Sequence, residues 1–169
     1  SSDLYFRDTR AEGKDILGDE QWKWLEEELK NSKAEYILIG SGTQIFPDDR
    51  FLPESWFEWS RQKLYELIRK YKRSGVVLLS GDVHYAEFMK YPCKERIGYD
   101  LWEFTSSGLT HFIASQVKYI DEFTKRLYPT TYNDMEDKYM ERNFGVLNIS
   151  FGSNPGILMQ VRNYNGHLV

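Results

Sequence analysis

The residues with the clearest potential for chemistry are Asp82 and His84, which follow the apolar run Val76–Leu79 and the turn residue Gly81. In an extended segment, side chains two positions apart point the same way, so a carboxylate and an imidazole would face one site. Carboxylate oxygen suits hard cations such as Ca²⁺ or Mg²⁺, whereas imidazole suits iron or zinc. The pair is therefore a candidate ligand set for two neighbouring metal ions of different hardness.

The place of this pair in the chain supports the hypothesis. The apolar run predicts a buried strand, and sites in open α/β sheets gather beyond the carboxyl ends of strands. Paired metal ions at such an edge can polarise a phosphate ester and stabilise phosphoryl transfer. An Asp-x-His pair also has a simpler explanation, a capping aspartate and a surface histidine, and the residue types alone favour that explanation.

Composition limits the classes of protein to consider. A chain of 169 residues with 41% hydrophobic and 28% charged residues is typical of one soluble globular domain. The net charge of −4 argues against a broad surface for nucleic acid or anionic membranes. Cys93 is the only cysteine, so an intramolecular disulfide is excluded, and no apolar run approaches the length of a membrane span.

Hydrophobic periodicity predicts a mixed α/β fold without an internal boundary. Trp22, Leu25 and Leu29 recur at helical spacing after Asp19, which can cap a helix. The alternation near the C-terminus predicts a hairpin that turns at 153–156, and 167–169 resembles the start of a further strand. The expected helices are 19–31, 55–73 and 112–127, and the expected strands are 36–39, 76–79, 86–91, 101–105, 144–151 and 157–161.

Several motifs together resemble one family. Ser80-Gly81-Asp82-Val83-His84 resembles the last metal-binding motif of the PhoD-like alkaline phosphatases, a branch of the calcineurin-like metallophosphoesterases. Further segments are similar to family segments in the same order, and the joint order is more specific than any one of them. These segments are Ile16–Leu25, Glu54–Trp56, Phe104–His111 and Asn143–Gly145.

The resemblance implies a fold and a metal centre. The chain would be the C-terminal half of a four-layer αββα sandwich that acts on phosphate monoesters or diesters. Iron and calcium are the metals of the best-matching branch, with manganese or zinc as alternatives, and Asp82 would face a calcium ion while His84 faces the iron. Arg7 lies in a segment similar to one whose arginine approaches the substrate phosphate, although a plain surface charge explains it as well.

The resemblance also implies that part of the domain lies outside these residues. The family's first metal motif, its bridging aspartate and its Asn-His-Asp motif have no counterpart here. We expect residues 1–169 to form a single domain that is the C-terminal portion of the family's domain and to need the upstream half as a partner. A calcium ion takes about 6–8 oxygen ligands, so this portion alone should bind metal weakly, carry no catalytic residue and turn over nothing.

Two functions are compatible with the sequence. The first is hydrolysis of phosphate esters by the full-length protein, and the second is a non-catalytic, truncated paralogue used for binding or assembly. The segment that begins at Ser1 is no signal peptide, and the residues do not fix a compartment, although the resemblance favours secretion or the secretory pathway.

Four other polar residues are weaker candidates for a functional role. His111 could act beside the site, but a helix-start residue capped by Thr110 explains it better. Gln44 could face the site from its loop, with ordinary loop polarity as the better explanation. Cys93 has no base beside it and is not expected to be a nucleophile, and His167 is expected to be exposed.

Overall fold

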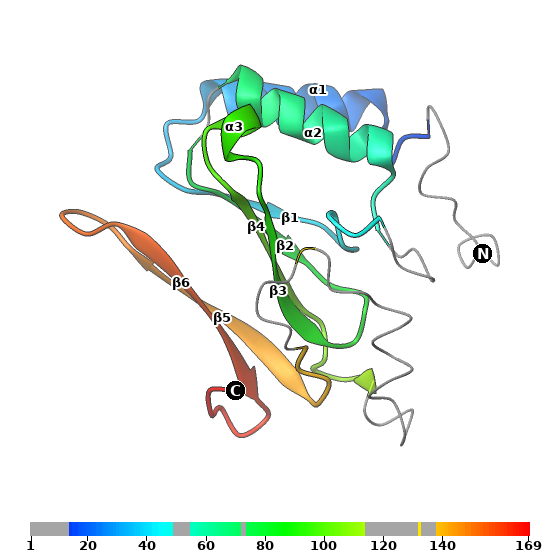
Figure 1. Ribbon diagram of the computed structural model, residues 1–169, viewed down its shortest axis with the longest axis vertical. Coiled ribbons are helices and arrows are strands. Elements are labelled where there is room, and N and C mark those ends of the chain that lie inside the picture. Colours follow the sequence, from blue (N-terminus) through cyan, green and yellow to red (C-terminus); the bar gives the residue numbers. More distant parts are fainter. Residues whose placement is uncertain (1–13, 49–54, 72–73, 114–131, 133–137) are drawn as a thin grey trace.

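A computed structural model describes residues 14–48, 55–71, 74–113, 132 and 138–169, and all statements below refer to these residues. Helices and strands form a mixed α/β arrangement (Figure 1), which confirms the predicted fold class. The elements are α1 (Gly18–Asn31), β1 (Ile37–Gly40), α2 (Glu58–Lys70), β2 (Val76–Ser80), β3 (Ala86–Tyr91), α3 (Lys94–Ile97), β4 (Leu101–Ser106), β5 (Asn143–Ser150) and β6 (Gly156–Asn163).

The main sheet has the strand order β1-β2-β4-β3. Strands β1, β2 and β4 run parallel, with Leu79 of β2 opposite Gly40 on one side and Phe104 on the other. Strand β3 runs antiparallel at one edge, as its short connection from β2 requires. The carboxyl ends of the parallel strands therefore meet at one edge of the sheet, where the Gly81–His84 segment begins.

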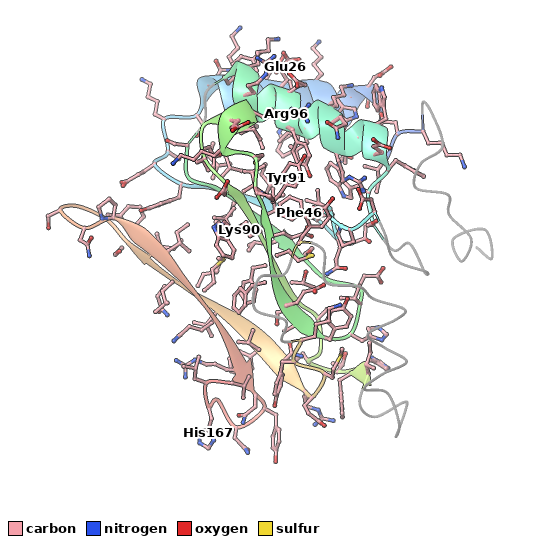
Figure 2. The ribbon with its side chains drawn as sticks, in the orientation of Figure 1. Glu26, Phe46, Lys90, Tyr91, Arg96 and His167 are labelled. Atoms are coloured by element: carbon pink, nitrogen blue, oxygen red, sulfur yellow. The ribbon has the colours of Figure 1, made fainter. Side chains whose placement is uncertain are left out.

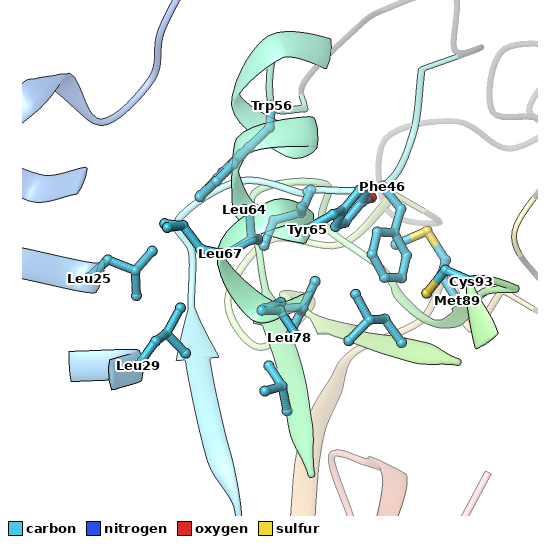
Figure 3. Close-up of a cluster of buried hydrophobic side chains, with 14 of the residues drawn as sticks. Leu25, Leu29, Phe46, Trp56, Leu64, Tyr65, Leu67, Leu78, Met89 and Cys93 are labelled. Carbon is cyan, nitrogen blue, oxygen red and sulfur yellow. The ribbon is translucent and has the colours of Figure 1, made fainter. Parts of the chain in front are cut away.

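The helices cover one face of this sheet (Figure 1). Apolar side chains of α1 and α2 pack with residues of β2, β3 and β4 in the main core (Figure 3). Phe46 and Tyr91, labelled in Figure 2, contribute aromatic rings whose centres lie 5.7 Å apart. Asp19 lies inside α1, whose N-cap residue is Leu17, so the predicted capping role of Asp19 was wrong. The first turn is held instead by Asp15, whose carboxylate accepts hydrogen bonds from the backbone N–H of Gly18 and from Trp22 Nε1.

The hairpin β5–β6 packs on the opposite face of the sheet (Figure 1). Val161 of β6 is buried with Phe104 and Ala86, and the tip of the hairpin places Phe151 against Tyr36 with ring centres 5.8 Å apart. A helical layer, a four-stranded sheet and a two-stranded sheet are therefore stacked in the described part of the chain. The predicted helix at 112–127 lies almost entirely outside the described residues.

Element boundaries follow local hydrogen bonding. Strand β3 has the predicted bounds, whereas α2 begins later than expected because the backbone N–H of Trp56 is bonded to the carbonyl of Gln44 at 2.9 Å. The short helix α3 was not expected. Residues 167–169 form only a bridge, in which Leu168 pairs with Arg162. No helix in the described ranges has both the length and the apolar character needed to cross a membrane.

Gly145 sets how closely the two sheets approach. A Cβ atom at this position would lie 2.8 Å from the ring of Phe104 and 3.1 Å from Cβ of Ser106. Phe104 cannot easily retreat, because its ring is stacked on Phe88 with ring centres 4.7 Å apart.

We therefore expect Gly145→Ala to destabilise the protein by about 1–3 kcal/mol, because overpacking outweighs the gain from replacing glycine in a strand. Urea unfolding measures the effect. Gly42→Ala is the control, since a Cβ there meets nothing within 4 Å. Equal stability of the two variants would contradict the packing described here.

Candidate metal centre

The segment after β2 has an unusual backbone. Asp82 and His84 have φ angles of 75° and 61°, in the left-handed region that non-glycine residues rarely adopt. The predicted extended conformation was therefore wrong, and strand alternation does not set the directions of the Asp82 and His84 side chains. Val83, which lies between them in the sequence, has a buried side chain. Asp82 and His84 flank it at the edge of the sheet.

Both candidate ligands are accessible. Asp82 is exposed and His84 is partly buried. Within the described residues, neither the carboxylate nor the imidazole ring has a hydrogen bond or an ion pair. A carboxylate and an imidazole that stay open at the carboxyl edge of a parallel sheet are suited to an external ligand. The donor types fit a hard ion beside a softer one, as the sequence indicates.

A second histidine lies close to this segment. The ring centres of His84 and His111 are 5.8 Å apart, with an angle of 32° between the ring planes. Sequence reasoning favoured a structural role for His111 at a helix start and missed this contact. The available signal was topological, because His111 follows β4 and β4 is the parallel neighbour of β2.

No group of three or more His, Cys, Asp or Glu side chains is placed to hold a metal ion in the described ranges. Asp82, His84 and His111 therefore do not form one closed ligand set. Arg7, the candidate for binding substrate phosphate, lies outside the described residues and stays a prediction.

A buried polar network lies directly behind the segment. Gln44 is 1% exposed, and its amide donates to Glu87 Oε1 at 2.7 Å and to Thr105 Oγ1 at 2.9 Å. Ordinary loop polarity is therefore the wrong explanation for Gln44. The Thr105 hydroxyl is also 2.7 Å from that of Ser80, the last residue of β2, so the network reaches the residue before Gly81.

Glu103 completes this network from the centre of β4. Its two carboxylate oxygens accept hydrogen bonds from the backbone N–H groups of Ile45 and Phe46, both at 2.8 Å. Complete burial raises the pKa of Glu103 from 4.5 to about 7, although hydrogen bonds from Ser80 and from those two N–H groups act in the opposite direction. This carboxyl group therefore fixes the loop after β1 to the middle of the sheet.

Cys93 is buried, and its thiol donates to the carbonyl of Tyr99 at 3.4 Å. Burial raises the pKa of this thiol, which disfavours the thiolate form that a nucleophile needs. His167 lies in the turn that follows β6 (Figure 2) and is exposed, as expected.

The candidate ligands Asp82 and His84 thus lie at the carboxyl edge of a mixed α/β sheet, the edge where α/β proteins commonly place their sites. Comparison with known proteins narrows the class of α/β protein. The PhoD-like phosphatase family model matches residues 4–155, which is most of the chain. The chain therefore belongs to the PhoD-like phosphatase family, whose members are in general metal-dependent.

Comparison with individual proteins shows only distant similarity. No curated protein matches this chain. The solved structure of PhoD is similar, with 18% sequence identity and a TM-score of 0.49. The alignment covers 93% of this chain and 36% of the PhoD chain, so the residues described here correspond to a minor part of that protein's length.

The raised pKa of Glu103 predicts how stability depends on pH. Between pH 4.5 and about 7 the Glu103 carboxyl group holds its proton more tightly in the folded state than in the unfolded state. The stability that the protonated group contributes is therefore fully present below pH 4.5 and is lost as the pH rises to about 7. The loss should be roughly 3 kcal/mol. Glu103→Gln should remove this slope, which urea unfolding between pH 4 and 8 measures.

The exposed glutamate Glu20 on α1 provides the matched control, Glu20→Gln. That variant should keep the pH dependence of the parent protein. A Glu103→Gln protein whose stability still falls over the same pH interval by the same amount would show that another group titrates there.

Proposed function

We propose that the full-length protein hydrolyses phosphate esters at a metal centre to which this chain contributes Asp82 and His84. The observation that carries the proposal is the left-handed segment at the carboxyl end of β2, which leaves a carboxylate and an imidazole open to solvent. Membership of a phosphatase family supports phosphate-ester hydrolysis as the reaction class. Asp82 would hold calcium and His84 iron, with manganese or zinc as alternative occupants.

Bound metal ions would supply positive charge that polarises the ester and stabilises the charge on the transferring phosphoryl group. The residues of this chain have a different task, which is to keep two ligand side chains in place before metal arrives. Val83 is 5% exposed, and the N–H of His84 donates to Ser107 Oγ at 2.9 Å, so the backbone that bears the ligands is anchored on both sides. Anchored ligands lose less conformational entropy when they bind.

The remaining ligands are proposed to come from the rest of the domain. An apolar surface supports this part of the proposal. Among the described residues, strand β1 pairs only with β2, and Leu38, Ile149, Leu158 and Phe151 are each more than a third exposed. A groove lined by Trp24, Leu25 and Leu38 also follows the β1 edge. Exposed apolar surface of this kind is a common sign of a missing neighbour.

We expect Asp82→Ala and His84→Ala to remove most activity and most bound metal from the full-length protein. Loss of a direct ligand should cost at least the roughly 10–100-fold that follows loss of a group supporting a ligand. Hydrolysis of a chromogenic phosphate ester and elemental analysis of the purified protein measure the two effects.

Asp19→Ala and His167→Ala are matched controls, because both residues are exposed and lie outside the segment. Both controls should retain metal and activity. Full activity in both the Asp82 and the His84 variants would end the assignment of this site and would favour a non-catalytic binding or assembly module.

Arg7 is proposed to bind the substrate phosphate. Arg7→Ala should then raise KM by about tenfold to a hundredfold, as expected when a hydrogen-bonded charge is lost. Arg7→Lys should recover only part of the loss, because lysine lacks the paired donors of a guanidinium group. Steady-state kinetics with Arg10→Ala as the control measures this, and an unchanged KM in Arg7→Ala would leave Arg7 as a surface charge.

A further inference from the structure

Both ends of the segment Ser107–Ile113 are hydrogen-bonded to the backbone of His84. The N–H of His84 donates to Ser107 Oγ at 2.9 Å, and the carbonyl of His84 accepts from the N–H of Ile113 at 3.1 Å. Both ends of the segment are therefore tied to the residue that carries the candidate imidazole ligand. His111 lies between these two hydrogen-bonded ends and is thereby placed at the same edge of the sheet as His84.

The second sheet fixes this segment further. The carbonyl of Gly108 accepts from the N–H of Asn143 in β5 at 3.1 Å, and Asn143 Oδ1 accepts from the hydroxyl of Ser106 at 2.9 Å. A Cβ atom at Gly108 would collide with the amide of Asn143, so the close approach requires glycine here. The position of His111 thus depends on long-range contacts and not only on its neighbours in sequence.

The two imidazole rings have a separation that suits joint coordination. Two imidazoles that bind one ion at a tetrahedral angle, with metal–nitrogen bonds of about 2.0–2.1 Å, have ring centres roughly 5 Å apart. The observed separation of 5.8 Å exceeds this by less than 1 Å. Neither side chain is buried, so packing does not prevent the rotations that would bring the rings closer.

The hydroxyl group of Thr110 is placed to fix which nitrogen of the His111 ring carries the proton. The Thr110 hydroxyl oxygen lies 3.2 Å from Nδ1 of His111. When Nδ1–H donates to this oxygen, the proton is held on Nδ1 and the lone pair of Nε2 is left for an ion. A hydrogen bond to the second ring nitrogen is the usual companion of a metal-bound histidine.

From these contacts we propose that His84 and His111 jointly coordinate the transition-metal ion of the centre, while Asp82 faces the harder ion. The inference rests on the proposed function, to which it adds a ligand. An imidazole pair selects a first-row transition-metal ion such as iron or zinc over calcium or magnesium, because calcium and magnesium prefer oxygen. The transition-metal ion would thus be bound by His84, which follows β2, and by His111, which follows the neighbouring parallel strand β4.

The test uses Zn²⁺ as the probe on metal-free full-length protein. Competition with a chromogenic chelator gives the dissociation constant, and X-ray absorption at the zinc edge counts the bound imidazoles. We expect His111→Gln to raise the dissociation constant at least about tenfold and to lower the imidazole count by one. His167→Gln, which changes the exposed histidine after β6, should match the parent protein in both measurements.

A measurement on the unmutated protein guards against misfolding of the variant. Zn²⁺ should protect His84 and His111, but not His167, from modification by diethyl pyrocarbonate, as read by mass spectrometry. Modification of His111 that is unaffected by Zn²⁺, or a His111→Gln protein with unchanged affinity and imidazole count, would overturn the inference.

The outcomes separate the inference from the proposed function. If His84→Gln loses zinc while His111→Gln does not, the phosphatase site stands and only the paired coordination fails. If neither variant affects zinc binding, the ion lies elsewhere and both ideas fail.

Discussion

The candidate site depends on one backbone constraint, the left-handed conformation of Asp82 and His84 at the end of β2. Such a conformation costs a non-glycine residue of order 1–3 kcal/mol and persists only where the surroundings determine it. Here the surroundings are the buried side chain of Val83 and the hydrogen bonds that Ser107 and Ile113 make to His84. The neighbouring strand β4 and its continuation therefore hold the segment in a form that its own sequence disfavours.

The buried polar network gives this segment a rigid support. Glu103 fixes the loop after β1 through two backbone N–H groups, and Gln44 in that loop bonds to Thr105 of β4. Thr105 in turn contacts Ser80, immediately before the turn. Buried polar groups are costly unless they are hydrogen-bonded, so this arrangement specifies one register between the loop and the strands. The site edge thus depends on the buried side chains of Gln44, Glu103 and Thr105.

Local patterns in the sequence predicted the elements well, because apolar periodicity reports on which side of an element is buried. Strand β3 and the hairpin illustrate this, whereas α3 is too short to show a period. The positive φ angles at Asp82 and His84 and the burial of Gln44 arise from contacts between distant segments. So does the approach of His111 to His84, which needs the pairing of β2 with β4. No local pattern encodes these features, and the family resemblance identified Asp82 and His84 without predicting their backbone.

The segment after β2 is proposed to hold metal through Asp82 and His84. Crystallography of the metal-loaded full-length protein, with anomalous data at the iron edge, tests it most directly. We expect an iron peak bonded to a ring nitrogen of His84 and a second ion within about 2.6 Å of an Asp82 oxygen. Metal peaks that are bound only by other residues, with Asp82 and His84 both in contact with solvent alone, would contradict it.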